Sequence, residues 1–367
     1  MSRRLIVCSD GTWQSEDAAA PSNVCRLADR LADTGSDGKP QRVFYQSGVG
    51  TDPTRGRLNR KFSSVMGGGF GIGLDRNILD IYRWLMHEYS PGDELWFFGF
   101  SRGAYTVRST VGLVRNCGIL KPAYERLADR AMALYRARGS DSHPNAPRSR
   151  SFRRNYAHEV REVQFVGVWD TVGALGIPGW LGMPASIINR RHRFHDTCLS
   201  SIVRHAYHAL AVDEQRRTFD PAIWKEPEGK RFTGTVEQTW FPGVHSDVGG
   251  GYPERAIADV TLCWMLDRAV KLGLGTVAEP TDVLAPDPAG DIHDSRWWVH
   301  RRPGIRRIAT ARRAIEPGDG QAAHAAVRQR MTALPEYRPE NLLRAIEAGL
   351  PELAAEESAV CPPPRHP

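Results

Sequence analysis

An apolar segment that ends at a glycine-flanked serine is the feature that most constrains how this chain can fold. Residues 93–100, DELWFFGF, are apolar almost throughout, and the helical pattern of residues 101–118 follows directly. A parallel strand covered by helices on both faces has this composition. The serine at the junction, Ser101, lies within GFSRG (99–103). We therefore expect a sharp turn there from a buried strand into a helix.

Strand and helix patterns alternate along most of the chain, which is typical of an α/β fold. Further expected strands cover residues 4–11, 41–48, 162–170, 206–214 and 236–245, and further expected helices include 74–89 and 256–273. We expect a doubly wound, mostly parallel sheet of about six strands with helices on both faces. This domain would cover residues 1–280, and a peripheral C-terminal extension with short helices would cover residues 281–367.

The composition is that of a globular chain, with 41% hydrophobic and 25% charged residues. No apolar run approaches the roughly 18 residues of a membrane-spanning helix, and Leu5–Cys8 is too short for a secretory leader. We expect a cytoplasmic protein, with export by a dedicated secretion system left open. Six cysteines without CxxC pairing favour free thiols. The net charge of 49 − 42 = +7 favours anionic partners.

A serine hydroxyl becomes a strong nucleophile only when a base removes its proton. Catalysis by Ser101 would therefore require a histidine and an orienting carboxylate at other strand ends. His245 follows the last expected strand, in a glycine-rich loop. We expect His245 to be the general base and the backbone N–H of Arg102 to donate to an oxyanion. The alternatives are a purely structural turn at Ser101 and a structural hydrogen bond at His245.

Two carboxylates compete for the third position. Asp170 ends the expected strand 162–170, and Asp213 ends the expected strand 206–214. Both would lie at the same sheet edge as Ser101 if all strands are parallel. Their spacing does not decide between them.

The chain resembles a known family over about residues 4–275. Five ordered segments carry the similarity: SDGTW (9–13), GFSRGAYTVR (99–108), FVGVWDTVG (165–173), HALAVDEQRRTF (208–219) and WFPGVHSDVGGGY (240–252). They resemble the catalytic domain of bacterial type VI secretion phospholipase effectors of the first lipase family. The resemblance implies an α/β-hydrolase-like fold and a triad of Ser101, Asp170 and His245, and so favours Asp170 over Asp213.

The resemblance also places the loop after the first strand where a second oxyanion donor is expected. Gly11 and Thr12 are the candidates, and Asp10 is expected to order that loop through its carboxylate. Asp247, two residues after His245, is expected to brace the glycine-rich turn, because a lone aspartate lacks the several oxygen ligands that calcium requires. We expect neither a metal nor an organic cofactor.

A glycine-rich segment and three arginine clusters give weaker indications of function. The segment GGGFGIG (67–73) lacks both phosphate-binding fingerprints, so we expect a flexible loop. Arginines form three clusters: 148, 150, 153 and 154; 190, 191 and 193; and 301, 302, 306, 307, 312 and 313. They predict a solvated face or attraction to an anionic membrane. Without interleaved aromatic residues they do not favour nucleic acid.

These patterns together predict a serine esterase or lipase. Its substrate would be a lipid, a phospholipid or another small-molecule carboxylic ester, cleaved through an acyl-enzyme. The alternatives are a non-lipid housekeeping esterase and a non-catalytic binding or scaffold protein that keeps the same fold. The sequence leaves the oligomeric state open.

Overall fold

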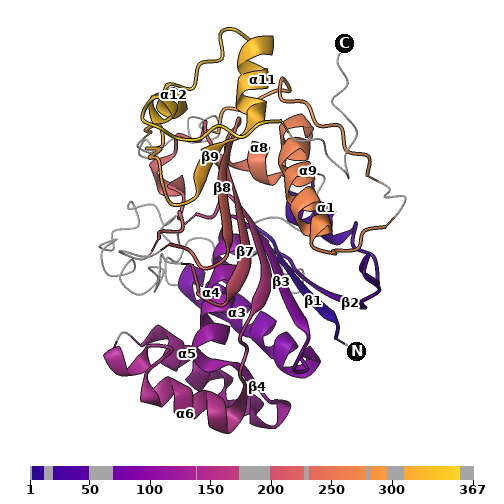
Figure 1. Ribbon diagram of the computed structural model, residues 1–367, viewed down its shortest axis with the longest axis vertical. Helices are drawn as coiled ribbons and strands as arrows, with labels where there is room; N and C mark the ends of the chain where they lie inside the picture. The colour runs from indigo at the N-terminus through magenta and orange to yellow at the C-terminus, as the bar shows by residue number, and fades with distance from the viewer. Residues whose placement is uncertain are drawn as a thin grey trace.

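A single parallel sheet organises the computed structural model, which describes residues 2–11, 20–48, 69–137, 139–172, 199–226, 231–277, 282–295 and 310–355. Within these residues seven strands run in the order β2-β1-β3-β6-β7-β8-β9 (Figure 1). Their bounds are β1 Arg4–Ser9, β2 Gln41–Gln46, β3 Glu94–Phe100, β6 Val163–Trp169, β7 Val203–Ala211, β8 Thr235–Phe241 and β9 Gln321–Ala323. The predicted doubly wound α/β fold is confirmed, with one strand more than expected.

All pairings between neighbouring strands in this sheet are parallel. The interior strand β3 pairs with β1 on one side and with β6 on the other, and Phe100 lies opposite Trp169. The carboxyl ends of the strands therefore meet at one edge of the sheet, where ligands bind in open α/β sheets. The residues that follow β3, β6, β7 and β8 gather there.

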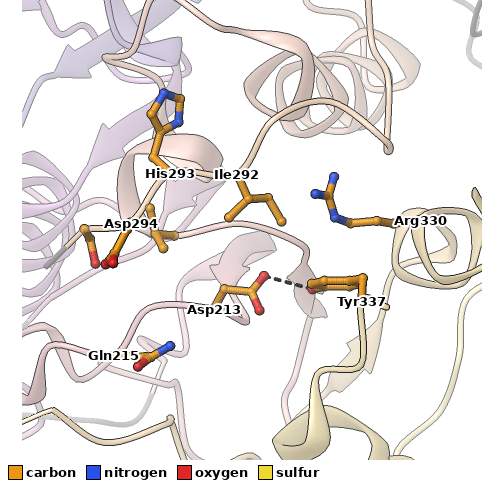
Figure 2. A pocket seen from close by; sticks show the side chains of 9 residues that line it. Asp213, Gln215, Ile292, His293, Asp294, Arg330 and Tyr337 are labelled. Carbon is orange, nitrogen blue, oxygen red and sulfur yellow. Dashed lines mark hydrogen bonds between the residues drawn. The ribbon is translucent and has the colours of Figure 1, made fainter. Parts of the chain in front are cut away.

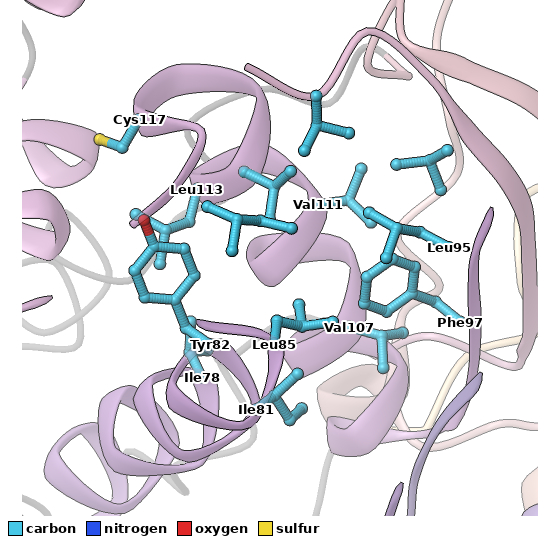
Figure 3. Close-up of a cluster of buried hydrophobic side chains, with 14 of the residues drawn as sticks. Ile78, Ile81, Tyr82, Leu85, Leu95, Phe97, Val107, Val111, Leu113 and Cys117 are labelled. Atoms are coloured by element: carbon cyan, nitrogen blue, oxygen red, sulfur yellow. The ribbon is translucent and has the colours of Figure 1, made fainter. Parts of the chain in front are cut away.

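One face of the sheet is covered by α3 Gly69–Glu88 and α4 Arg102–Cys117, and α5 Ala128–Arg136 and α6 Pro147–Tyr156 pack behind these two helices (Figure 1). Beside them, β4 Ile119–Leu120 and β5 Ala157–His158 form a short antiparallel pair. Figure 3 shows Leu95 and Phe97 of β3 meeting Ile81 and Leu85 of α3 and Val107 of α4, all of them buried. This packing fixes the start of α4 against the end of β3.

The opposite face packs against α1 Asn23–Ala28 and α9 Ala256–Lys271 (Figure 1). Trp96 and Phe98 of β3 point to this side, as expected for residues that alternate along a strand. The rings of Trp96 and Phe165 stack with centroids 5.1 Å apart. Each face of β3 is thus apolar, which is why its sequence is apolar almost throughout.

The C-terminal segment, expected to be peripheral, extends the sheet. It contributes β9 and then α11 Ala325–Ala333 and α12 Glu340–Glu347, drawn in yellow in Figure 1. Trp240 of β8 is fully buried in a third core cluster together with Val327 and Leu342 of these helices. Residues 310–355 therefore share a core with the last strands of the main sheet.

Three local expectations are wrong. Residues 69–73 form the first turns of α3 instead of a loop, although glycine disfavours helices. His245 begins a short helix, α8 His245–Gly249, instead of lying in a loop. Cys8 and Cys117 carry free thiols as expected, but Cys263 is disulfide-bonded.

None of the helices in the described part of the chain combines the length and apolar character needed to cross a bilayer.

Candidate active site

Ser101 lies at the sharp turn between β3 and α4. Its backbone has φ 56° and ψ −117°, a strained conformation that a residue other than glycine adopts only when the surrounding structure enforces it. Glycines on both sides make the turn possible. A Cβ at Gly99 would come within 2.7 Å of the Ala104 backbone, and one at Gly103 would come within 2.0 Å of the Ser9 carbonyl oxygen. The Gly-x-Ser-x-Gly pattern thus reflects two close backbone approaches.

Three side chains predicted from the sequence form one hydrogen-bonded chain. His245 Nε2 lies 2.8 Å from Ser101 Oγ, and His245 Nδ1 lies 2.6 Å from Asp170 Oδ2. An ionised carboxylate only accepts hydrogen bonds, so Nδ1 carries the imidazole proton. Nε2 of the neutral ring is then the acceptor for the Ser101 hydroxyl. This arrangement allows the imidazole to remove the serine proton.

The imidazole of His245 is enclosed by two aromatic rings. Phe100, the last residue of β3, lies 4.7 Å away between ring centroids. Phe219, at the end of the 3₁₀ helix η4 Arg217–Phe219, packs edge-on at 4.9 Å. Burial lowers the pKa of His245, and the Asp170 carboxylate opposes this shift. The ring is therefore held in its neutral form, which a general base needs.

Asp170 follows β6 in an unusual conformation that several contacts hold in place. Its φ is 38°, in the left-handed region that favours glycine. Its own N–H donates to the Ala209 carbonyl at 2.7 Å, and the N–H of Ala211 donates to Asp170 Oδ1 at 3.1 Å. The next residue, Thr171, donates its N–H to Nε2 of the buried His208 at 3.0 Å. These contacts aim the carboxylate at His245.

The same carboxylate is bound by a buried arginine, Arg313, which was not predicted from the sequence as a site residue. Arg313 Nη1 lies 2.6 Å from Asp170 Oδ1, and Nη2 lies 2.9 Å from Oδ2. Burial alone would raise the pKa of Asp170, but the charge and hydrogen bonds of Arg313, together with His245, outweigh burial and hold this pKa well below its usual range. Asp170 is therefore an anion although it is fully buried.

His208 and Glu214 also support the site, and neither was predicted to do so. Burial lowers the pKa of His208 to about 3, so its neutral ring can accept the Thr171 N–H. Glu214 accepts the backbone N–H of His245 at 3.3 Å. Burial would raise the pKa of Glu214, but the fork of Arg216 lowers it to about 2. The motif HALAVDEQRR contains these residues, but no feature of the pattern separates them from ordinary strand-end residues.

Asp213, the competing acid, is bound by groups other than the His245 imidazole. Its Oδ2 accepts the Gly243 N–H at 2.7 Å and the Tyr337 hydroxyl at 2.8 Å. Asp213 lines a cavity of about 290 Å³ together with Tyr337 and Arg330 of the C-terminal segment. Figure 2 shows these three side chains around the cavity. Burial raises the pKa of Asp213. Asp213 thus stabilises the turn that leads into His245.

Asp247 contacts the same turn. Its Oδ2 accepts the Val244 N–H at 2.9 Å, and its Oδ1 lies 2.6 Å from His293 Nδ1. Burial raises the pKa of Asp247. Among the described residues, no three histidine, cysteine or acidic side chains lie together in a way that could hold a metal ion.

Gly11, the last described residue before the gap that follows β1, lies beside Ser101: a Cβ built on Gly11 would be 3.4 Å from the Ser101 Cβ. The Asp10 carboxylate accepts the Gly11 N–H at 2.6 Å, the Ser22 hydroxyl at 2.6 Å and the Tyr45 hydroxyl at 2.8 Å. The Gly11 N–H is therefore engaged by Asp10 in this conformation. Thr12 lies outside the described residues.

Arg102 is the first residue of α4, where the helix dipole places partial positive charge.

The arginine clusters contain both buried and exposed side chains. Arg313 is buried at Asp170, and Arg153 is buried with its guanidinium on the Asn116 and Pro144 carbonyls, so their interpretation as surface residues is wrong. Arg148, Arg150, Arg154 and Arg312 are exposed. Residues 190–193 and 301–307 lie outside the described part of the chain.

Comparisons with known proteins identify the family. Residues 3–268 match the family described as "T6SS, Phospholipase effector Tle1-like, catalytic domain". An uncharacterized protein of Saccharomyces cerevisiae is 27% identical over 230 residues, which are 59% of this chain and 32% of that protein. A crystal structure of an uncharacterized protein from Pseudomonas aeruginosa shares 20% identity at a TM-score of 0.40, over 75% of this chain and 46% of the other.

The chain therefore spans less than half the length of each of these two relatives. The family match, by contrast, covers well over half of this chain. This chain belongs to the family of type VI secretion phospholipase effector Tle1-like catalytic domains.

Proposed function

We propose that this protein is a serine hydrolase that cleaves carboxylic esters, with the acyl esters of lipids or phospholipids as its substrate class. One observation carries the proposal: a continuous hydrogen-bonded path runs from Ser101 Oγ through His245 to Asp170 at the carboxyl edge of the sheet. Membership in a phospholipase effector family supports the lipid class.

The proposed reaction begins when His245 Nε2 takes the Ser101 proton and Oγ attacks the acyl carbonyl. The resulting imidazolium gives this proton to the departing alcohol, and an acyl-Ser101 ester remains. Water then attacks the ester while His245 accepts its proton, and the acid leaves as Ser101 is restored. Asp170 keeps the proton of the resting imidazole on Nδ1 and stabilises the imidazolium.

The tetrahedral intermediates need donors for a developing oxyanion. We propose the backbone N–H of Arg102, because it lies at the positive end of α4 and directly follows the nucleophile. The loop at Gly11 and Thr12 is the proposed second source. Gly11 would have to release Asp10 to serve, since its N–H donates there at 2.6 Å.

A panel of substrates tests this function. We expect the wild type to hydrolyse p-nitrophenyl butyrate and phospholipid vesicles, and Ser101→Ala to lower turnover by about 10⁶-fold. Ser109→Ala is the matched control, because Ser109 is a buried serine of α4 whose Oγ forms no hydrogen bond with any described residue. Near-wild-type activity of Ser101→Ala would reject the mechanism. Cleavage of the short ester but not of the vesicles would reject the lipid class.

A further inference from the structure

Arg313 joins the C-terminal segment to the centre of the site through four hydrogen bonds. Two run to the two oxygens of Asp170, and two more run to the carbonyl oxygens of Ala211 at 2.8 Å and Phe219 at 2.5 Å. The side chain of Arg313 is only 3% exposed, and that of Asp170 is 0% exposed. A planar guanidinium that grips both carboxylate oxygens fixes the orientation of the carboxylate.

The guanidinium also links three parts of the site. Asp170 follows β6, Ala211 ends β7, and Phe219 ends η4 and packs on the His245 ring. The Arg313 side chain thus fixes the acid and one wall of the imidazole pocket at once. It comes from outside residues 3–268, the part of the chain that the family match covers.

Among the described residues, two ion pairs face His245. Arg313 faces Asp170, which contacts the Nδ1 side of the ring, and Arg216 faces Glu214, which contacts the His245 backbone. His208, a further titratable group beside the Asp170 turn, is neutral because burial lowers its pKa to about 3. The charge of Asp220 also acts on Arg313 and helps to raise its pKa. The stabilisation of a protonated His245 by Asp170 is therefore offset by Arg313.

We infer that Arg313 is a positioning residue of the proposed hydrolase: it orients Asp170 and balances its charge, so that His245 stays unprotonated and able to act as a base in mildly acidic solution. This inference rests on the proposed function for its effect on turnover. The contact geometry that supports it is independent of any substrate. The lowered pKa of the buried His245 agrees with it.

Two substitutions at Arg313 separate charge from geometry. Arg313→Gln removes the charge, so the buried Asp170–His245 pair should bind a proton more readily. The acid limb of the kcat/KM profile for p-nitrophenyl butyrate should then move to higher pH by at least about one unit. Arg313→Lys keeps the charge but loses the paired contact of two nitrogens with the two oxygens of Asp170. Its acid limb should stay near that of the wild type, while kcat falls by about tenfold or more through misplacement of Asp170.

Arg153→Gln is the matched control, because Arg153 is another buried arginine bound to two backbone carbonyls, and it contacts no residue of the site. Its acid limb should not move. An unchanged acid limb in folded Arg313→Gln, or an equal upward shift in Arg313→Lys, would overturn the inference. If Arg313→Gln does not fold, wild-type kcat in Arg313→Lys would overturn it.

A titration followed by NMR separates this inference from the proposed function. The His245 ring signals, assigned by their loss in His245→Gln, should titrate at higher pH in Arg313→Gln than in the wild type. If they do so while Ser101→Ala leaves hydrolysis intact, the hydrolytic mechanism fails and the role of Arg313 stands. If hydrolysis depends on Ser101 but His245 titrates alike in both proteins, the role of Arg313 fails alone.

Discussion

Asp170→Asn is expected to remove both catalysis and much of the stability of the fold. The amide still fills the site, but it cannot balance the Arg313 charge, whose two nitrogens lie 2.6 and 2.9 Å from the carboxylate oxygens. Removing one partner of a buried ion pair destabilises a protein by ~3–5 kcal/mol. The amide also favours the wrong imidazole tautomer, which lowers turnover by ~10⁴-fold in hydrolases with this arrangement.

A double-mutant cycle tests the reasoning behind this estimate. Asp170→Asn combined with Arg313→Gln removes both charges, so it should regain most of the ~3–5 kcal/mol lost by the single variant. Turnover should stay as low as in Asp170→Asn. Stability is measured by urea unfolding followed by circular dichroism, and turnover with p-nitrophenyl butyrate.

Asp213→Asn is the comparison for this cycle. Its amide oxygen can still accept from Gly243 and Tyr337. We expect its turnover to stay within about tenfold of wild type, since no charge that orients His245 changes. A larger loss of turnover in Asp213→Asn than in Asp170→Asn, or wild-type stability of Asp170→Asn, would refute the reasoning.

Three further outcomes are expected. Gly103→Ala should destabilise the fold by more than the ~1–3 kcal/mol usual for overpacking, because its Cβ would lie 2.0 Å from the Ser9 carbonyl oxygen; wild-type stability in urea would contradict the close approach. Stability should fall as the pH drops from 6.5 toward about 3, because the unfolded chain takes up protons on His208 and His245 that the folded chain does not; a constant urea midpoint over this range would contradict the lowered pKa values. Binding to anionic vesicles through the exposed Arg148, Arg150 and Arg154 should weaken with added salt, and sedimentation with vesicles that is independent of salt would count against a membrane role for this cluster.

The local parts of the site could be predicted from the sequence. The run of apolar residues before Ser101 and the helical pattern after it specify the turn through contacts between close neighbours along the chain. His245 could be predicted because parallel strands bring their carboxyl ends to one edge. Asp170 and Asp213 both satisfy that rule, so only the resemblance to the effector family separated them.

Arg313 could not be predicted, because it lies 143 residues from its partner Asp170 in a basic segment typical of a protein surface. Its role depends on how residues 310–355 return to the sheet, which no local pattern specifies. For the glycines within residues 69–73, a local pattern gave the wrong prediction. Their low helix propensity predicts a loop, but they form the start of α3, whose later turns are packed on the sheet.

Reaction with a fluorophosphonate tests the central claim most directly, because this reagent modifies serines that a neighbouring base has made nucleophilic. Mass spectrometry of the digested protein should show one adduct, on the peptide that contains Ser101. It should be lost in Ser101→Ala and nearly lost in His245→Gln. A folded wild-type protein that takes up no reagent, or that carries the adduct on another serine, would contradict the account.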